Sequence, residues 1–356
     1  MAHDVMTSRE RFKRMFDHCE ADRIPIIDGP WADTVARWRR EGLPEGADWV
    51  DYFGVDRVVG IGGDAGPRWP GRRLEETDEY VVDLTSWGVT LKNLKSTSVP
   101  QYLDFRIKDP DTWREARERM VPSRDRVNWE HLKANYQTWR EKDYWIQGHP
   151  WFGYDATHSF VAMERLLEAM IEQPEWCAEM FNHCLDVSLA LLDMIWDEGY
   201  TFDSIFWCDD MGYRGTQFFS LNMYRELLRP VQQRAIEWAH AKGIRAHLHS
   251  CGNIVPFVPE LIDIGLDALN PLEVKAGMDP LALKKAYGDR LLLHGGINAV
   301  LWDKPDEIEA EMRKVIPAIK EHGGYIFSSD HSVPSSVSLE DFRRIVNLAK
   351  ELGRYD

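Results

Sequence analysis

The sequence predicts an α/β protein built as a single (β/α)8 barrel, the TIM-barrel architecture. Short apolar runs recur along the chain, and helical patterns separate the later runs. No glycine-rich phosphate turn follows the first run, which argues against an open doubly wound sheet as the alternative. Because no linker or low-complexity tract interrupts the pattern, we expect one domain over residues 1–356.

Eight strands are expected in this barrel. They are residues 23–28, 57–62, 144–148, 204–209, 245–250, 268–273, 291–296 and 325–330. An amphipathic N-terminal helix precedes them. Further helices are expected to start after Ser220, at Pro305 and after Ser338, which is the expected N-cap of the last helix. Long excursions follow the second and third strands, at 63–143 and 150–203. The first contains charged, Trp-containing helical patterns, and the second reads as two helices split near Pro174.

Composition excludes several classes of protein. The formal net charge is −16 and no cluster of Lys and Arg stands out, so nucleic acids and anionic membranes are not expected partners. No apolar run approaches the roughly 18 residues that span a bilayer. The five cysteines are widely spread and odd in number, which indicates reduced thiols. A cytoplasmic enzyme is the expectation.

Ionisable residues gather where the expected strands end. In a barrel of this kind the active site lies at the carboxyl ends of the strands. Those ends carry Asp28, His149, Asp209 with Asp210, His249 with Cys251, Glu273, His294, and Asp330 with His331. We therefore expect these side chains to surround one pocket for a small-molecule substrate.

The stretch "RAHLHSCGN" indicates a metal site. Side chains alternate along a strand, so His247, His249 and Cys251 share one face. His249 and Cys251 come last, about 7 Å apart, and can share one zinc ion, whereas His247 lies one layer deeper in the core. His331 is the expected third ligand. The alternative interpretations are a packed His with a buried Cys, and a solvated turn at Asp330–His331.

The other strand-end residues have expected roles as well. Adjacent strand residues point to opposite faces, so one of Asp209 and Asp210 enters the pocket as a general acid or base and the other caps the next segment. Glu273 is expected to ligate the metal, orient a ligand or handle protons. The residues expected to contact substrate are Asp28, His149, His294 and Asp330. For His149 a helix cap is the alternative, and for His294 a close backbone contact beside two glycines.

Several motifs resemble the uroporphyrinogen decarboxylase superfamily over nearly the whole chain. They are "WCDDMGYRG", "LLRPVQQRAIEWAHAKGIRAHLHSCGNI", "LNPLEVKAGMDP" and "LLLHGGIN". The resemblance implies a single (β/α)8 barrel, a homodimer, and one of two activities: decarboxylation in the porphyrin pathway, or zinc-dependent methyl exchange with a corrinoid. The H-x-C-G motif is similar to that of the methyltransferase branch, which binds zinc through this His, this Cys and a later Cys.

Two departures from the family pattern shape the expectation. The decarboxylase signature M-R-Q-A-G-R is absent, and "DGPWADTVARWRREGLP" stands in its region. No Cys follows Cys251, and His331 in "SSDHSVP" falls about where the later Cys would be. We expect zinc-dependent methyl transfer between a small substrate and a corrinoid cofactor or corrinoid protein. The alternatives are a metal-free decarboxylase of a porphyrinogen or pyrrolic carboxylate, and a non-catalytic binding protein.

Overall fold

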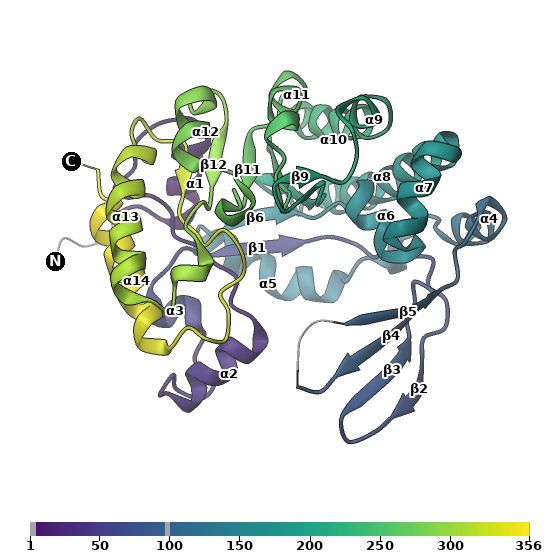
Figure 1. Cartoon of the computed structure of the whole chain (residues 1–356), viewed down its shortest axis with the longest axis horizontal. Helices are drawn as coiled ribbons and strands as arrows, with labels where there is room; N and C mark the ends of the chain where they lie inside the picture. The colour runs from purple at the N-terminus through teal and green to yellow at the C-terminus, as the bar shows by residue number, and fades with distance from the viewer. Residues whose placement is uncertain (1–4, 97–99, 356) are drawn as a thin grey trace.

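A curled parallel sheet of seven strands forms the centre of the molecule (Figure 1). The structure, a computed structural model, describes residues 5–96 and 100–355. The spatial order of the strands is β1 (Val58–Ile61), β6 (Trp145–Gly148), β7 (Ser204–Cys208), β10 (Arg245–His249), β11 (Ala268–Asn270), β12 (Leu292–His294) and β13 (Tyr325–Ile326). Each pair of neighbours is parallel, so all seven strands end on the same side of the sheet. This arrangement is consistent with a TIM-barrel-like fold.

The first expected strand, 23–28, contributes extended backbone but no strand. Ile26 forms a single parallel bridge with Phe327, and Arg23 pairs instead in the antiparallel sense with Arg354. Pro25, between them, has no N–H group to donate to a ladder. Within the described residues the central sheet therefore has seven strands, where the sequence predicted eight.

Helices follow most strands, as predicted, and lie outside the sheet in Figure 1. They are α1 (Ser8–Phe16), α2 (Ala32–Arg40), α3 (Trp49–Phe53), α4 (Pro110–Arg119), α5 (Trp129–Glu141), α6 (Gly153–Val161), α7 (Met163–Glu172), α8 (Pro174–Asp197), α9 (Leu221–Met223), α10 (Arg229–Ala241), α11 (Val258–Asp263), α12 (Pro280–Tyr287), α13 (Pro305–Ile319) and α14 (Leu339–Leu352). The expected break at Pro174 is confirmed, because α8 begins there, but residues 150–203 hold three helices where two were predicted. Ser338 caps α14 as predicted. A helix also begins after Ser220, as predicted, but a π-helical turn, η2 (Tyr224–Leu228), separates α9 from α10. In the described residues no helix is both long and apolar enough to cross a membrane.

The excursion 63–143 contains a second sheet that the sequence analysis did not predict. Its four antiparallel strands are β2 (Arg72–Glu76), β3 (Tyr80–Leu84), β4 (Val89–Leu94) and β5 (Gln101–Phe105), and they project away from the central sheet (Figure 1). Every residue of β2 is exposed, and the strand reads "RRLEE". Without a buried face, such a strand lacks the alternation of apolar and polar residues that identifies strands in a sequence.

Helix α1 covers the amino-terminal ends of the strands. The rings of Phe12 and Phe16 both stack on Trp145, with centroids 5.3 Å apart in each case. The helix is also held by charge, because the buried Arg11 donates hydrogen bonds to Asp22 and Asp56. Helix α1 is therefore fixed against this end of the strands by aromatic packing and by buried ion pairs.

Candidate metal centre

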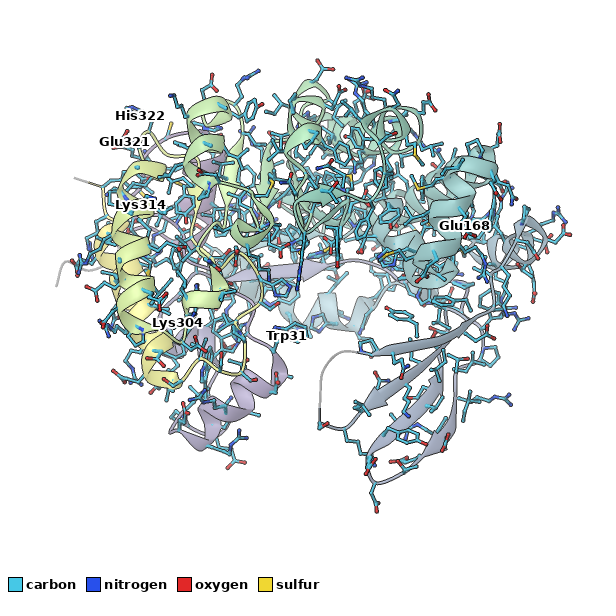
Figure 2. The ribbon with its side chains drawn as sticks, viewed as in Figure 1. Trp31, Glu168, Lys304, Lys314, Glu321 and His322 are labelled. Atoms are coloured by element: carbon cyan, nitrogen blue, oxygen red, sulfur yellow. The ribbon has the colours of Figure 1, made fainter. Side chains whose placement is uncertain are left out.

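A cavity of about 460 Å³ lies at the carboxyl ends of the central strands. Its lining residues are Ile27, Asp28, Gly29, Trp31, Phe206, Asp210, His249, Cys251, Asn270, Pro271, His294, Ser328, Ser329, His331 and Ser332. In Figure 2, Trp31 lies near the centre of the view, whereas Glu168 on α7 and Lys314 on α13 lie farther out. Six of the strand-end residues predicted from the sequence line this cavity. The cavity therefore lies on the side of the sheet where the sequence predicted the pocket.

Three side chains of the cavity converge as metal ligands could. One ligand atom each of Asp210, His249 and Cys251 lies within 4.8 Å of the other two. His249 Nε2 is 3.3 Å from Cys251 Sγ and 3.6 Å from the nearer oxygen of Asp210. One carboxylate, one imidazole and one thiol form a donor set that suits zinc, which accepts oxygen, nitrogen and sulfur ligands.

Neighbouring groups hold two of these ligands in position. His249 Nδ1 lies 2.5 Å from Asn270 Oδ1, an atom that can only accept, so Nδ1 carries the proton and Nε2 presents its lone pair to the cluster. The turn after Cys251 is held by Glu273, whose carboxylate accepts the N–H of Gly252 at 2.6 Å. Asp210 accepts the N–H of Cys251 itself at 2.8 Å. Glu273 therefore holds the turn that follows Cys251, and its predicted role in ligand or proton handling stays a prediction.

Burial disfavours the charged forms of the thiol and of the Asp210 carboxyl at this site. Burial raises the pKa of the Cys251 thiol far above its ordinary value, and the carboxylates of Asp210 and Glu273 raise it further. Burial also raises the pKa of Asp210, whereas the charge of His249 lowers it. A bound divalent cation would reverse this balance by stabilising the thiolate and the carboxylate. The electrostatics thus suit a cation.

His331, the third ligand predicted from the sequence, lines the same cavity but does not belong to this cluster. Its ring stacks on Trp31, with centroids 6.3 Å apart and planes inclined by 19°. Asp210 is the residue that completes the group of three. The loop after β13 therefore brings His331 to the wall of the cavity, and its role as a ligand stays a prediction.

Asp209 points away from the cavity, as alternation along β7 requires. Its carboxylate is fully buried and accepts hydrogen bonds from the Asp155 N–H and the Gln232 side chain, at 2.9 and 2.8 Å. Burial raises its pKa to about 7. Asp209 therefore anchors the start of α6, while Asp210 enters the pocket.

The residues expected to contact substrate divide into two pairs. Asp28 and His294 line the cavity. Asp28 also accepts the N–H and hydroxyl of Ser329, at 2.9 and 2.8 Å, and burial raises its pKa to about 6. His294 lies 3.2 Å from His247, which is buried as expected, and burial lowers the pKa of His294 to about 3.

His149 and Asp330 are not among the residues that line the cavity. The ring of His149 packs edge-on against Phe206, with centroids 5.7 Å apart. Asp330 is fully buried and accepts the backbone N–H groups of Ala299 and Val274, at 2.7 and 2.9 Å. Asp330 thus joins the loops after β11 and β12.

Several residues at this site were missed from the sequence. They are Trp31, Phe206 and Asn270 in the cavity wall, and Asp155, His158 and Cys208 beside it. Asn270 ends β11, so the rule that strand ends carry function could have found it. Asp155 and His158 lie on α6, 2.9 Å apart, and only the tertiary structure brings that helix to the cluster.

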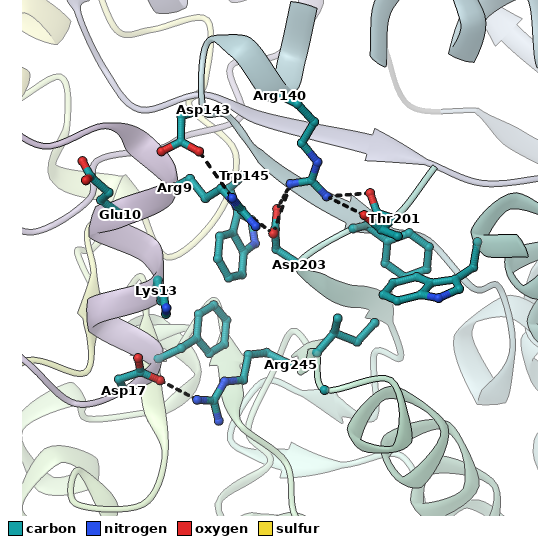
Figure 3. Close-up of a pocket in the computed structure, with 15 residues that line it drawn as sticks. Arg9, Glu10, Lys13, Asp17, Arg140, Asp143, Trp145, Thr201, Asp203 and Arg245 are labelled. Atoms are coloured by element: carbon teal, nitrogen blue, oxygen red, sulfur yellow. Dashed lines mark hydrogen bonds and ion pairs between the residues drawn. The ribbon is translucent and has the colours of Figure 1, made fainter. Parts of the chain in front are cut away.

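A second cavity, of about 560 Å³, lies at the opposite end of the strands (Figure 3). Its charged side chains pair with one another: Arg9 and Arg140 both contact Asp203, and Arg245 contacts Asp17. Such mutual pairing stabilises the fold and leaves little charge to bind a ligand. Amino-terminal ends of barrel strands ordinarily serve stability. We therefore assign the functional site to the smaller cavity.

Comparison with known proteins agrees with this location. Residues 157–352 match the family described as Uroporphyrinogen decarboxylase (URO-D), a range that includes Asp210, His249, Cys251 and His331. The uroporphyrinogen decarboxylase of Pelodictyon phaeoclathratiforme (strain DSM 5477 / BU-1) is 26% identical over 136 residues. That match covers 36% of this chain and 37% of the relative's own length.

Solved structures extend the likeness to nearly the whole chain. A methyltransferase from Methanosarcina mazei superimposes with a TM-score of 0.61 at 16% sequence identity, covering 97% of this chain and 99% of that one. At this identity the match shows a shared fold. An endo-1,4-beta-xylanase from Penicillium canescens, with a TM-score of 0.33, is too dissimilar to bear on the fold. The family match spans more than half of the sequence and includes the candidate metal centre, so this chain belongs to the uroporphyrinogen decarboxylase family.

Proposed function

We propose that this protein is a zinc-dependent methyltransferase that exchanges a methyl group between a small substrate and a corrinoid cofactor or corrinoid protein. The observation that carries the proposal is the convergence of Asp210, His249 and Cys251 in one cavity. These residues would hold the zinc ion. Bound zinc lowers the pKa of a coordinated alcohol, thiol or amine and so makes it a better methyl acceptor. The structural likeness to a methyltransferase supports the same reading.

The other residues of the site would position these ligands and the substrate. Asn270 keeps His249 in the tautomer with a free Nε2, and Glu273 keeps the turn after Cys251 in place. The rings of Trp31 and Phe206 form apolar parts of the wall. A cavity of about 460 Å³ suits a small substrate, and the corrinoid would approach from its open side.

Decarboxylation of a porphyrinogen or pyrrolic carboxylate is the second candidate. The family description and the curated relative favour it, and Asp210 offers a carboxylate inside the cavity that could stabilise a protonated ring nitrogen. The charge of the cavity weighs against it. None of the described residues that line the cavity is Lys or Arg, and uroporphyrinogen carries eight carboxylates that require cationic partners.

Metal analysis and a methyl-transfer assay test the first candidate. Protein purified without a His tag should contain one zinc ion per chain, and the Cys251→Ser variant should lose most of it. With methylcobalamin as the methyl donor, a panel of thiols, alcohols and amines should contain an acceptor whose methylation is seen as a loss of the methylcobalamin absorbance. A protein without metal that decarboxylates uroporphyrinogen would instead establish the second candidate.

A further inference from the structure

A second thiol lies beside the metal cluster, at the end of strand β7. The register of the sheet pairs Cys208 on β7 with His249 on β10. Neighbouring strands lie about 4.8 Å apart, so the two backbones run close together at this level. In the sequence Cys208 was one of five scattered cysteines. The register of β7 against β10 makes it a neighbour of the candidate ligands.

The side chain of Cys208 lies on the inner face of the sheet. Phe206, two residues earlier, faces inward, because its ring contacts that of His247 with centroids 4.9 Å apart and lines the cavity. Side chains two residues apart on a strand share a face, so Cys208 shares the face of Phe206. Trp207, between them, packs outward on Phe152, with centroids 5.6 Å apart.

The charges around Cys208 are those around the cluster. Burial raises the pKa of Cys208 to about 12, and the carboxylates of Asp155 and Asp210 contribute in the same direction. Cys208 in turn is one of the groups that raise the pKa of Cys251. The two thiols therefore lie within electrostatic reach of each other. Cys208 is exposed and lies beside the cavity, outside the set of residues that line it.

We propose that Cys208 is a second thiolate ligand of the metal held by Asp210, His249 and Cys251. The proposal rests on the zinc site of the proposed function. Cys208 Sγ is not within 4.8 Å of all three ligand atoms, but rotation about its Cα–Cβ bond moves Sγ while the strand stays in place. Zinc favours thiolate ligands, and a second one makes the donor set softer and more selective for zinc over magnesium.

Counting the sulfur atoms bound to zinc tests this proposal. X-ray absorption at the zinc edge should give two sulfur neighbours at about 2.3 Å in the wild-type protein. The zinc that remains bound to the Cys208→Ser and Cys251→Ser variants should have one sulfur neighbour in each case. The control variant Cys19→Ser removes an exposed cysteine that follows α1, and its zinc should keep two sulfur neighbours. Zinc affinity, measured by competition with a chromophoric chelator, should fall about tenfold or more in Cys208→Ser.

Each outcome separates this proposal from the proposed function. One sulfur neighbour in the wild type, or two in Cys208→Ser, overturns the role of Cys208 and leaves the zinc site in place. A wild-type protein that takes up no zinc overturns both. Thermal unfolding of the variants checks that they fold, and the exchange of one atom, sulfur for oxygen, keeps the side-chain volume nearly unchanged.

Discussion

The Asp210 carboxylate lies 3.6 Å from His249 Nε2, although the two residues are 39 positions apart in the sequence and Asp210 follows β7 whereas His249 ends β10. Asp209, its neighbour in sequence, faces the other way. Asp210→Asn should therefore lower zinc affinity about tenfold or more, because it removes a charged ligand. Asp209→Asn is the matched control and should keep its zinc, while losing about 1–3 kcal/mol of unfolding free energy. Equal zinc loss in both variants would contradict the assignment of Asp210.

His331 is the residue that distinguishes the metal ligands predicted from the sequence from the cluster found in the structure. If Asp210, His249 and Cys251 hold the metal, His331→Ala should change zinc affinity by no more than about twofold, since His331 lies outside the cluster. The same change removes the ring stacked on Trp31 and should weaken substrate binding. Isothermal titration with zinc measures the first effect. If the His331→Ala variant instead loses its zinc, His331 is a ligand, as the sequence predicted.

Asn270 should affect the metal without touching it. Asn270→Ala removes the acceptor of His249 Nδ1–H, and loss of such a partner ordinarily costs about 10- to 100-fold in metal affinity. Asn270→Asp keeps an acceptor oxygen and should retain most of the affinity. Asn135→Ala, on the exposed face of α5, is the control and should bind zinc like the wild type. If both Asn270 variants were weakened alike, packing rather than orientation would be the cause.

Gly252 permits the close approach of two loops behind the cluster. Its φ is +78°, and an added Cβ would lie 2.1 Å from the backbone carbon of Gly212. Gly252→Ala should destabilise the protein by about 1–3 kcal/mol from backbone strain alone, and further through this contact. Gly215→Ala has a similar φ of +66° but no atom within 4 Å of the added Cβ, so it measures the strain by itself. Equal melting temperatures for the two variants would argue against the contact.

Acid should release the N-terminal helix through Asp22. The hydrogen bonds from Arg11 hold the pKa of this carboxyl below its usual value of 3.8, although burial acts in the opposite direction. Because the folded-state pKa is lowered, the stabilisation is present above pH 4 and is lost as the pH falls below it.

Asp22→Asn should accordingly lower the unfolding free energy by about 1–3 kcal/mol at pH 7 and flatten its decline below pH 4. Denaturant unfolding at pH values from roughly 2.5 to roughly 7 measures both effects. Asp51→Asn breaks an ion pair whose carboxylate side chain is 71% exposed, and should change stability by less than about 1 kcal/mol. An unchanged pH profile in Asp22→Asn would assign the acid sensitivity to other carboxylates.

The sequence by itself determined the parallel sheet with its alternating helices, and it located His249 and Cys251 at the functional end of a strand. Both are local properties, because hydrophobic periodicity and side-chain alternation are written into neighbouring residues. The break at Pro174 and the cap at Ser338 were predictable for the same reason.

Only the tertiary structure decided which residues join His249 and Cys251. The register of β7 against β10 brings Asp210 and Cys208 to them, and the loop after β13 takes His331 to Trp31. The sheet β2–β5 was also decided at this level, and its strand β2, which is exposed throughout, leaves no apolar pattern in the sequence. Register and loop path depend on contacts between distant residues, which spacing along the chain does not encode.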